Sequence, residues 1–93
     1  MIVAVMVMDL HCQGIRSLKE KRRIVLSIKD KLKKHHNISI IESDHLNLWQ
    51  NLQLAIAMVS TSKEIVDRVF GKIEDFVLFN YPVKVGRITK EFL

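Results

Sequence analysis

This chain of 93 residues has two similar halves, and each half has an apolar run followed by a capping box. The two patterns are Ser17-Leu18-Lys19-Glu20 and Thr61-Ser62-Lys63-Glu64. In a capping box, a Ser or Thr hydroxyl and a Glu carboxylate accept hydrogen bonds from backbone N–H groups that are free at a helix start. We therefore expect one helix to begin at each box.

Apolar residues at a helical period follow both boxes. The first helix ends in the basic segment Lys33–His36, before Asn37, which can supply the stop. The second helix ends before Tyr81-Pro82, because Pro cannot continue a helix. The apolar positions are Ile24, Val25, Ile28 and Leu32 in the first helix, and Ile65, Val66, Val69, Phe70, Ile73, Phe76 and Val77 in the second.

Four runs outside the helices predict β-strands. They are Ile2–His11, Asn37–Ser43, Asn51–Ser60 and Val83–Phe92, the last with Gly86 as a candidate bulge position. The first and third runs are the most apolar, which is typical of central strands buried on much of both faces. The polar segment Asp44–Gln50 is predicted to be a loop.

Strand-helix-strand, repeated twice, predicts an α+β fold of βαββαβ order, the ferredoxin-like two-layer sandwich. Right-handed crossovers place the first and third strands at the centre of a four-stranded antiparallel sheet, with both helices on one face. No Pro/Gly-rich linker interrupts the chain, so residues 1–93 are expected to form a single domain.

Composition favours a soluble cytoplasmic protein: 48% of the residues are hydrophobic and 27% are charged, as in globular domains. The single cysteine, Cys12, cannot form an intramolecular disulfide, which suggests a reducing compartment. The apolar start Ile2–Met8 is short and lacks a basic leader, so it reads as a strand rather than a signal peptide. No stretch reaches the roughly 18 apolar residues of a membrane span, so no membrane association is expected.

Positive charge is concentrated in one segment. Nine of the 15 basic residues lie between Arg16 and Lys34, against two acidic ones, whereas the rest of the chain carries six basic and eight acidic residues. This asymmetry indicates an anionic partner. The candidate residues for nucleic-acid or anion binding are Arg16, Lys19, Lys21, Arg22 and Arg23.

Lys21 is unusual among these residues because it falls on the apolar stripe of the first helix, in the first turn. Its side chain must either reach outward or pair with an acid. The alternative interpretation of the whole basic segment is a solvated helix face that only favours solubility.

The predicted topology brings the end of the first strand, the first helix start and the Asp44–Gln50 loop to one edge of the sheet. A basic helix start can bind a small anion there, or its side chains are simply solvated. Trp49 either stacks on a partner or covers the end of the core. No catalytic base, metal-ligand spacing or cofactor motif is recognisable, so we expect no catalytic residue, metal or cofactor. The edge residues are His11, Cys12, Arg16, Ser17, Lys19, Asp44, His45, Trp49 and Gln50.

The sheet face away from the helices is predicted to be aliphatic, which favours a homodimer through that face. Neither central strand contains Phe, Tyr or Trp, so base stacking on the sheet, as in RNA-recognition modules, is not expected. A protein-interaction module would present Asp44, His45, Trp49 and Gln50 as its interaction loop. The open-face residues are Val3, Val5, Val7, Ala55 and Ala57.

Several segments together resemble the YlxP-like family of small bacterial proteins, a domain-of-unknown-function group. They are the basic helix start Arg16–Arg23, the Asn37-Ile38-Ser39 strand entry and the segment from Asp44 through Leu48-Trp49-Gln50, together with a fourth segment, Ile56–Ser60. The resemblance spans essentially the whole chain. It implies a ferredoxin-like fold and a translation-related setting, and it supplies no activity.

The leading expectation is a non-enzymatic module that contacts structured RNA or the ribosome through the first helix. The alternatives are a protein-interaction module that dimerises through its open sheet face, and binding of a small anionic ligand at the first helix start.

Overall fold

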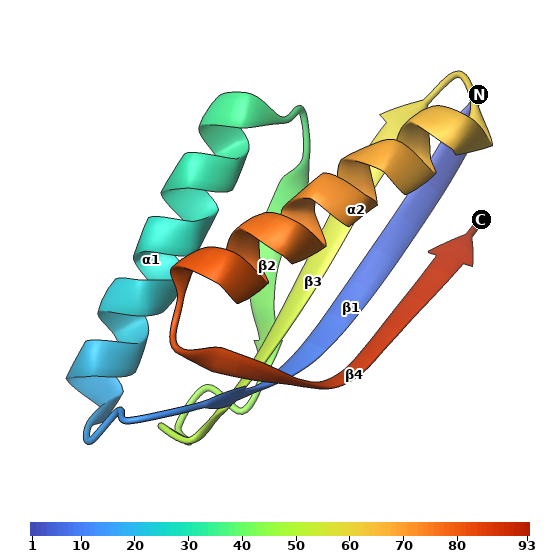
Figure 1. The fold of residues 1–93 in the computed structure, drawn as a ribbon. Coiled ribbons are helices and arrows are strands. Elements are labelled where there is room, and N and C mark those ends of the chain that lie inside the picture. The colour runs from blue at the N-terminus through green and yellow to red at the C-terminus, as the bar shows by residue number, and fades with distance from the viewer.

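The computed structural model of the protein describes residues 1–93, which form four strands and two helices in two layers (Figure 1). The βαββαβ order confirms the predicted fold. In chain order the elements are β1 (Ile2–Cys12), α1 (Leu18–His35), β2 (Ser39–Asp44), β3 (Asn51–Ser60), α2 (Lys63–Asn80) and β4 (Val83–Phe92).

The strands form one sheet in the order β2-β3-β1-β4, and every neighbouring pair is antiparallel. The apolar strands β1 and β3 lie at the centre, as predicted. Both helices cover the same face, with α1 beside β2 and α2 over the central strands (Figure 1). The other face carries no helix.

The core lies between the sheet and the helices. Alternate residues of β1 and β3 point into it, because side chains on a strand alternate between the two faces. The expected burial of much of both faces is only partial: apart from the exposed His11 and Val59, their other residues are half-buried, because no second layer covers them. The buried strand residues are Ala4, Met6, Met8 and Leu10 in β1, and Leu52, Leu54, Ile56 and Met58 in β3.

The first capping box forms as predicted. The Ser17 hydroxyl accepts a hydrogen bond from the Glu20 backbone N–H at 3.2 Å, and the Glu20 carboxylate accepts one from the Arg16 N–H at 2.9 Å. At the second box the cap is Ser62 rather than Thr61, since the Ser62 hydroxyl accepts from the Ile65 N–H. The second helix therefore begins one residue later than the Thr61–Glu64 pattern implies.

A bulge in the sheet and the end of one strand also matter for the site. The pairing of β1 with β4 shifts between Asp9 and Leu10, and Gly86 is the extra residue, which confirms the expected bulge. Strand β2 begins at Ser39 and runs through Asp44, so the following loop consists of residues 45–50.

No helix of the structure combines the length and the apolar character that a membrane span requires.

Candidate functional site

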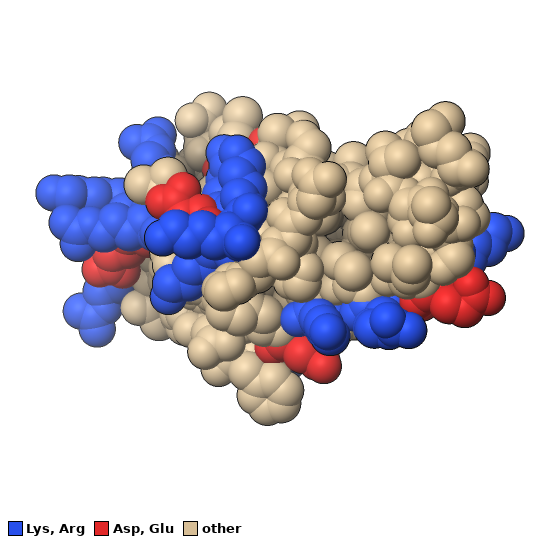
Figure 2. Space-filling view, turned by 90° about the horizontal axis from the view of Figure 1, so that it is seen from above, with Lys and Arg blue, Asp and Glu red and all other residues tan.

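Helix α1 carries an exposed basic face. Its side chains gather at one end of the molecule with small acidic areas among them (Figure 2). Apart from Lys21, no basic residue of this segment makes an ion pair within 4.0 Å. We define the basic face as Arg16, which precedes the helix, together with Lys19, Arg22, Arg23, Lys29, Lys31, Lys33 and Lys34, all exposed except the half-buried Lys29.

The two acidic residues of this segment, Glu20 and Asp30, carry two negative charges against the eight positive charges of the basic face. The Glu20 carboxylate already accepts a hydrogen bond at the helix cap. Asp30 lines a shallow hollow of about 410 Å³ together with Arg23, Lys31 and Lys34. The basic face therefore offers charged side chains on several sides of the helix, with no fixed partner inside the protein.

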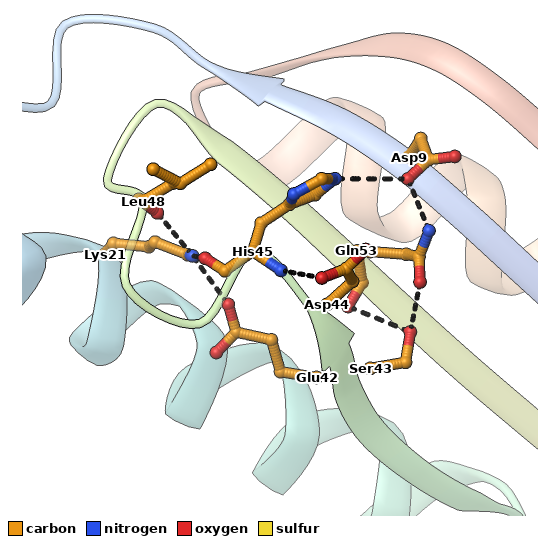
Figure 3. A network of polar contacts seen from close by, with 8 residues as sticks. All are labelled: Asp9, Lys21, Glu42, Ser43, Asp44, His45, Leu48 and Gln53. Carbon is orange, nitrogen blue, oxygen red and sulfur yellow. Dashed lines mark hydrogen bonds and ion pairs between the residues drawn. The ribbon is translucent and has the colours of Figure 1, made fainter.

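Lys21 does not belong to this face. Its side chain is 1% exposed, and its Nζ lies 2.6 Å from Glu42 Oε2. The same Nζ donates hydrogen bonds to the backbone carbonyls of His45 at 2.6 Å and Leu48 at 2.5 Å (Figure 3). The prediction that Lys21 contacts phosphate is therefore wrong, because its three N–H groups face acceptors inside the protein.

Glu42 was missed at the sequence level although a signal existed. It lies two residues after the buried Ile40 in β2, so strand alternation places both on the helix-covered face. An acid and a lysine that both map to apolar faces are candidates for a buried pair.

The loop of residues 45–50 is shaped by Lys21 and by local hydrogen bonds. His45 adopts a left-handed backbone with φ of 63°, and its N–H donates to Asp44 Oδ1 at 2.8 Å. The Leu48 N–H donates to the His45 carbonyl at 3.0 Å, and the Gln50 carbonyl accepts from the Cys12 N–H at 2.8 Å. The loop is thus tied to α1, to β1 and to itself.

The same loop exposes apolar side chains. Leu46 is 56% exposed and Leu48 is 46% exposed, whereas Trp49 is half-buried and lies outside the hydrophobic core cluster. Trp49 therefore does not act as a full plug of the core. Of the four predicted interaction-loop residues, Asp44 and Gln50 are exposed and His45 and Trp49 are half-buried.

A polar chain of hydrogen bonds continues from the loop onto the uncovered sheet face (Figure 3). The Ser43 hydroxyl donates to Gln53 Oε1 and the Gln53 amide donates to Asp9 Oδ1, both at 2.8 Å. His45 Nε2 lies 3.9 Å from the same Asp9 oxygen. These contacts orient the polar side chains at this end of the sheet.

Cys12 is half-buried at the start of the predicted edge. Burial raises the pKa of its thiol, while the nearby Lys21 ammonium lowers it and the Glu42 carboxylate raises it. A thiol with a raised pKa is a poor nucleophile at neutral pH. No three His, Cys, Asp or Glu side chains are grouped so that they could hold a metal ion.

The uncovered sheet face is aliphatic. Val3, Val5, Val7, Ala55 and Ala57 are half-buried on it, and two shallow hollows of about 300 and 170 Å³ lie along it. Two residues that sequence reasoning did not select extend this surface. They are Ile41, which is 55% exposed, and Val59, which is 60% exposed. The sequence could have identified them, because each alternates along its strand with a residue of the apolar core.

These features define a ferredoxin-like α+β domain with a basic helix on one side and an apolar sheet on the other. The chain belongs to the family described as proteins of unknown function, DUF503, whose model matches residues 3–89. It is 31% identical over 61 residues to the uncharacterized protein YlxP of Bacillus subtilis (strain 168). That match covers 66% of each protein, just under two thirds of the relative's length. The resemblance found in the sequence is confirmed.

Solved structures support the fold at low sequence identity. The structural genomics protein YJCS has a TM-score of 0.66 at 13% identity, covering 96% of both chains. The designed protein Foldit4 has a TM-score of 0.57 at 14% identity, covering 98% of this chain and 97% of its own. SnoaB, a cofactor-independent oxygenase from Streptomyces nogalater, has a TM-score of 0.50 at 5% identity, covering 98% and 90%.

Proposed function

We propose that this protein is a non-enzymatic binding module that contacts structured RNA, such as that of the ribosome, through the basic face of α1. The observation that carries this proposal is the set of eight basic side chains around one helix that lack an acidic partner within the protein. Unpaired surface cations attract the phosphate backbone and release its counterions on binding.

The chemistry of α1 favours binding to the backbone rather than to particular base sequences. Between Leu18 and His35 the helix carries no Asn or Gln and no Phe, Tyr or Trp. Its Lys and Arg residues suit phosphates, which position a protein on a nucleic acid without reading sequence. RNA helices are recognised largely by shape and backbone, so this composition suits a structured RNA.

The experiment is a salt titration of binding to a labelled ribosomal RNA fragment by fluorescence anisotropy. Affinity should fall linearly on a log–log plot, with a slope of about −0.7 to −0.9 for each phosphate neutralised. The double variant Arg22→Glu/Arg23→Glu should weaken binding and flatten this slope. The matched control Arg68→Glu/Lys84→Glu makes the same charge change on α2 and β4 and should bind nearly as tightly as the wild type.

Two results would contradict the RNA proposal. One is binding that is indifferent to salt. The other is a loss of affinity that is equal in the α1 variant and in the control, since net charge alone would then explain it.

A second candidate function is homodimerisation through the uncovered sheet face, favoured by its exposed Ile41 and Val59 beside a half-buried valine and alanine surface. From strand spacing, the face offers about 600 Å² of flat area per copy. Two copies would bury about 1,200 Å² in total, which is the low end of specific interfaces.

Light scattering after size exclusion tests this candidate. The wild type should elute as a dimer, and Ala57→Arg at the centre of the face should elute as a monomer with unchanged circular dichroism. Leu26→Arg on α1 is the control and should stay dimeric. A wild-type monomer at high micromolar concentration would contradict the dimer.

A further inference from the structure

The loop of residues 45–50 is longer than the hairpin between β2 and β3 requires. Two residues suffice to connect antiparallel strands, and this loop has six. The extra length is not left unorganised, because a buried lysine from another element holds two of its carbonyls. The shape of this loop is therefore defined by a tertiary contact.

Holding the loop in this way is costly for the fold. A buried ammonium must be removed from water, and a buried ion pair adds little net stability compared with apolar residues of similar size. What such a pair supplies is one defined arrangement, since Lys21 has matching acceptors only when the His45 and Leu48 carbonyls converge on it. The pair therefore specifies the conformation of the loop.

The loop also lies against the basic start of α1. The reach of one lysine side chain, from Lys21 to the Leu48 carbonyl, separates the first helical turn from the loop (Figure 3). Arg22 follows Lys21 directly and is exposed, and Arg16 and Lys19 precede it. Trp49, the only tryptophan of the chain, directly follows Leu48 and so belongs to the loop that Lys21 joins to this helix start.

We propose that the 45–50 loop holds an unpaired nucleotide of the RNA that α1 contacts, with Trp49 as the stacking surface. This inference rests on the proposed function. Unpaired bases can be splayed out and stacked on aromatic side chains, whereas bases inside a duplex cannot. Trp49 is half-buried within a fixed loop, so little ordering of its side chain opposes stacking. Lys21 is the positioning residue of this contact.

The test compares two RNAs with the same number of phosphates, a stem-loop and a fully paired duplex. Because Trp49 is the only tryptophan, its fluorescence reports on the loop directly. We expect the stem-loop to quench Trp49 and to bind about 10-fold more tightly than the duplex, within the range that one stacked base supplies. Trp49→Leu should bind both RNAs with the affinity of the duplex.

A second pair of variants tests the role of Lys21. The double variant Lys21→Met/Glu42→Leu removes both buried charges and so avoids an unpaired one. It should keep its circular dichroism and its duplex affinity but lose the preference for the stem-loop. Lys19→Met, which removes an exposed lysine of the same helical turn, should weaken both RNAs equally and keep the preference.

The outcomes separate this inference from the proposed function. Absence of binding to either RNA in the anisotropy assay would defeat the proposed function and this inference with it. Equal binding of both RNAs, without a change in Trp49 fluorescence, would overturn only this inference. The exposed leucines of the loop would then favour a protein partner. Retained preference in Trp49→Leu would also overturn it. If the double variant fails to fold, the RNA preference of Trp49→Leu still tests the inference.

Discussion

Lys21 Nζ lies 2.6 Å from Glu42 Oε2, inside the protein and between the first turn of α1 and strand β2. The two residues are 1% and 13% exposed, and the ammonium also holds two carbonyls of the loop. This pair links a helix, a strand and a loop through one side chain.

Removing one member of this pair should destabilise the protein strongly. Lys21→Met leaves the Glu42 carboxylate without its cation, and loss of one partner of a buried pair typically costs about 3–5 kcal/mol. Lys21→Met/Glu42→Leu should cost much less than either single change. Urea unfolding of Lys21→Met, Glu42→Leu and the double variant measures this coupling. Losses of unfolding free energy that add up across the two single variants would contradict it.

Two glycines should respond in opposite directions to alanine. A Cβ at Gly86 would lie 3.3 Å from both the Asp9 carbonyl oxygen and His11 Nε2, so Gly86→Ala should cost about 1 kcal/mol through overpacking. Gly71 is inside α2, and apart from its chain neighbours and the adjoining helix backbone no atom lies within 4 Å of the position that an added methyl group would take. Gly71→Ala should therefore add about 0.5–1 kcal/mol. Equal shifts in the urea midpoint would show that the bulge tolerates a side chain.

The pH dependence of stability should carry a contribution from His36. Burial, with the neighbouring positive charges of His35 and Lys72, lowers the pKa of its imidazole. The unfolded chain then binds more protons than the folded one between the two pKa values, so stability rises with pH in that window. His36→Gln should reduce the loss of stability on going from about pH 7 to about pH 5. NMR titration of His36 should show the lowered pKa, and an unshifted titration would contradict this prediction.

The Cys12 thiol should react slowly in the folded protein. Because burial raises its pKa, less thiolate is present at neutral pH than in the unfolded chain. Alkylation by iodoacetamide should therefore have its pH midpoint shifted upward in the native protein. In concentrated guanidinium chloride the midpoint should return to its ordinary value, and identical profiles in both states would disprove the shift.

Most of the fold could be predicted from local patterns. The Ser17 box, the alternation in β3 and the Gly86 bulge all depend on neighbours in the chain or on strand pairing, which obey general rules. The start of the second helix was predicted one residue too early because two neighbouring residues both fit the cap position. Thr61 and Ser62 both suit a cap, and in the structure Ser62 is the cap, since its hydroxyl accepts from the Ile65 N–H.

The site was less predictable because it depends on distances across the chain. The basic composition of residues 16–34 is a property of the sequence, and so is the position of Lys21 on the apolar stripe. The sequence left two outcomes for that lysine, reaching outward or pairing with an acid. The tertiary structure decided between them, because packing α1 against β2 brings Glu42 and the loop carbonyls within hydrogen-bond reach. A periodic pattern specifies which face a residue occupies, whereas its partner is set by how the layers pack.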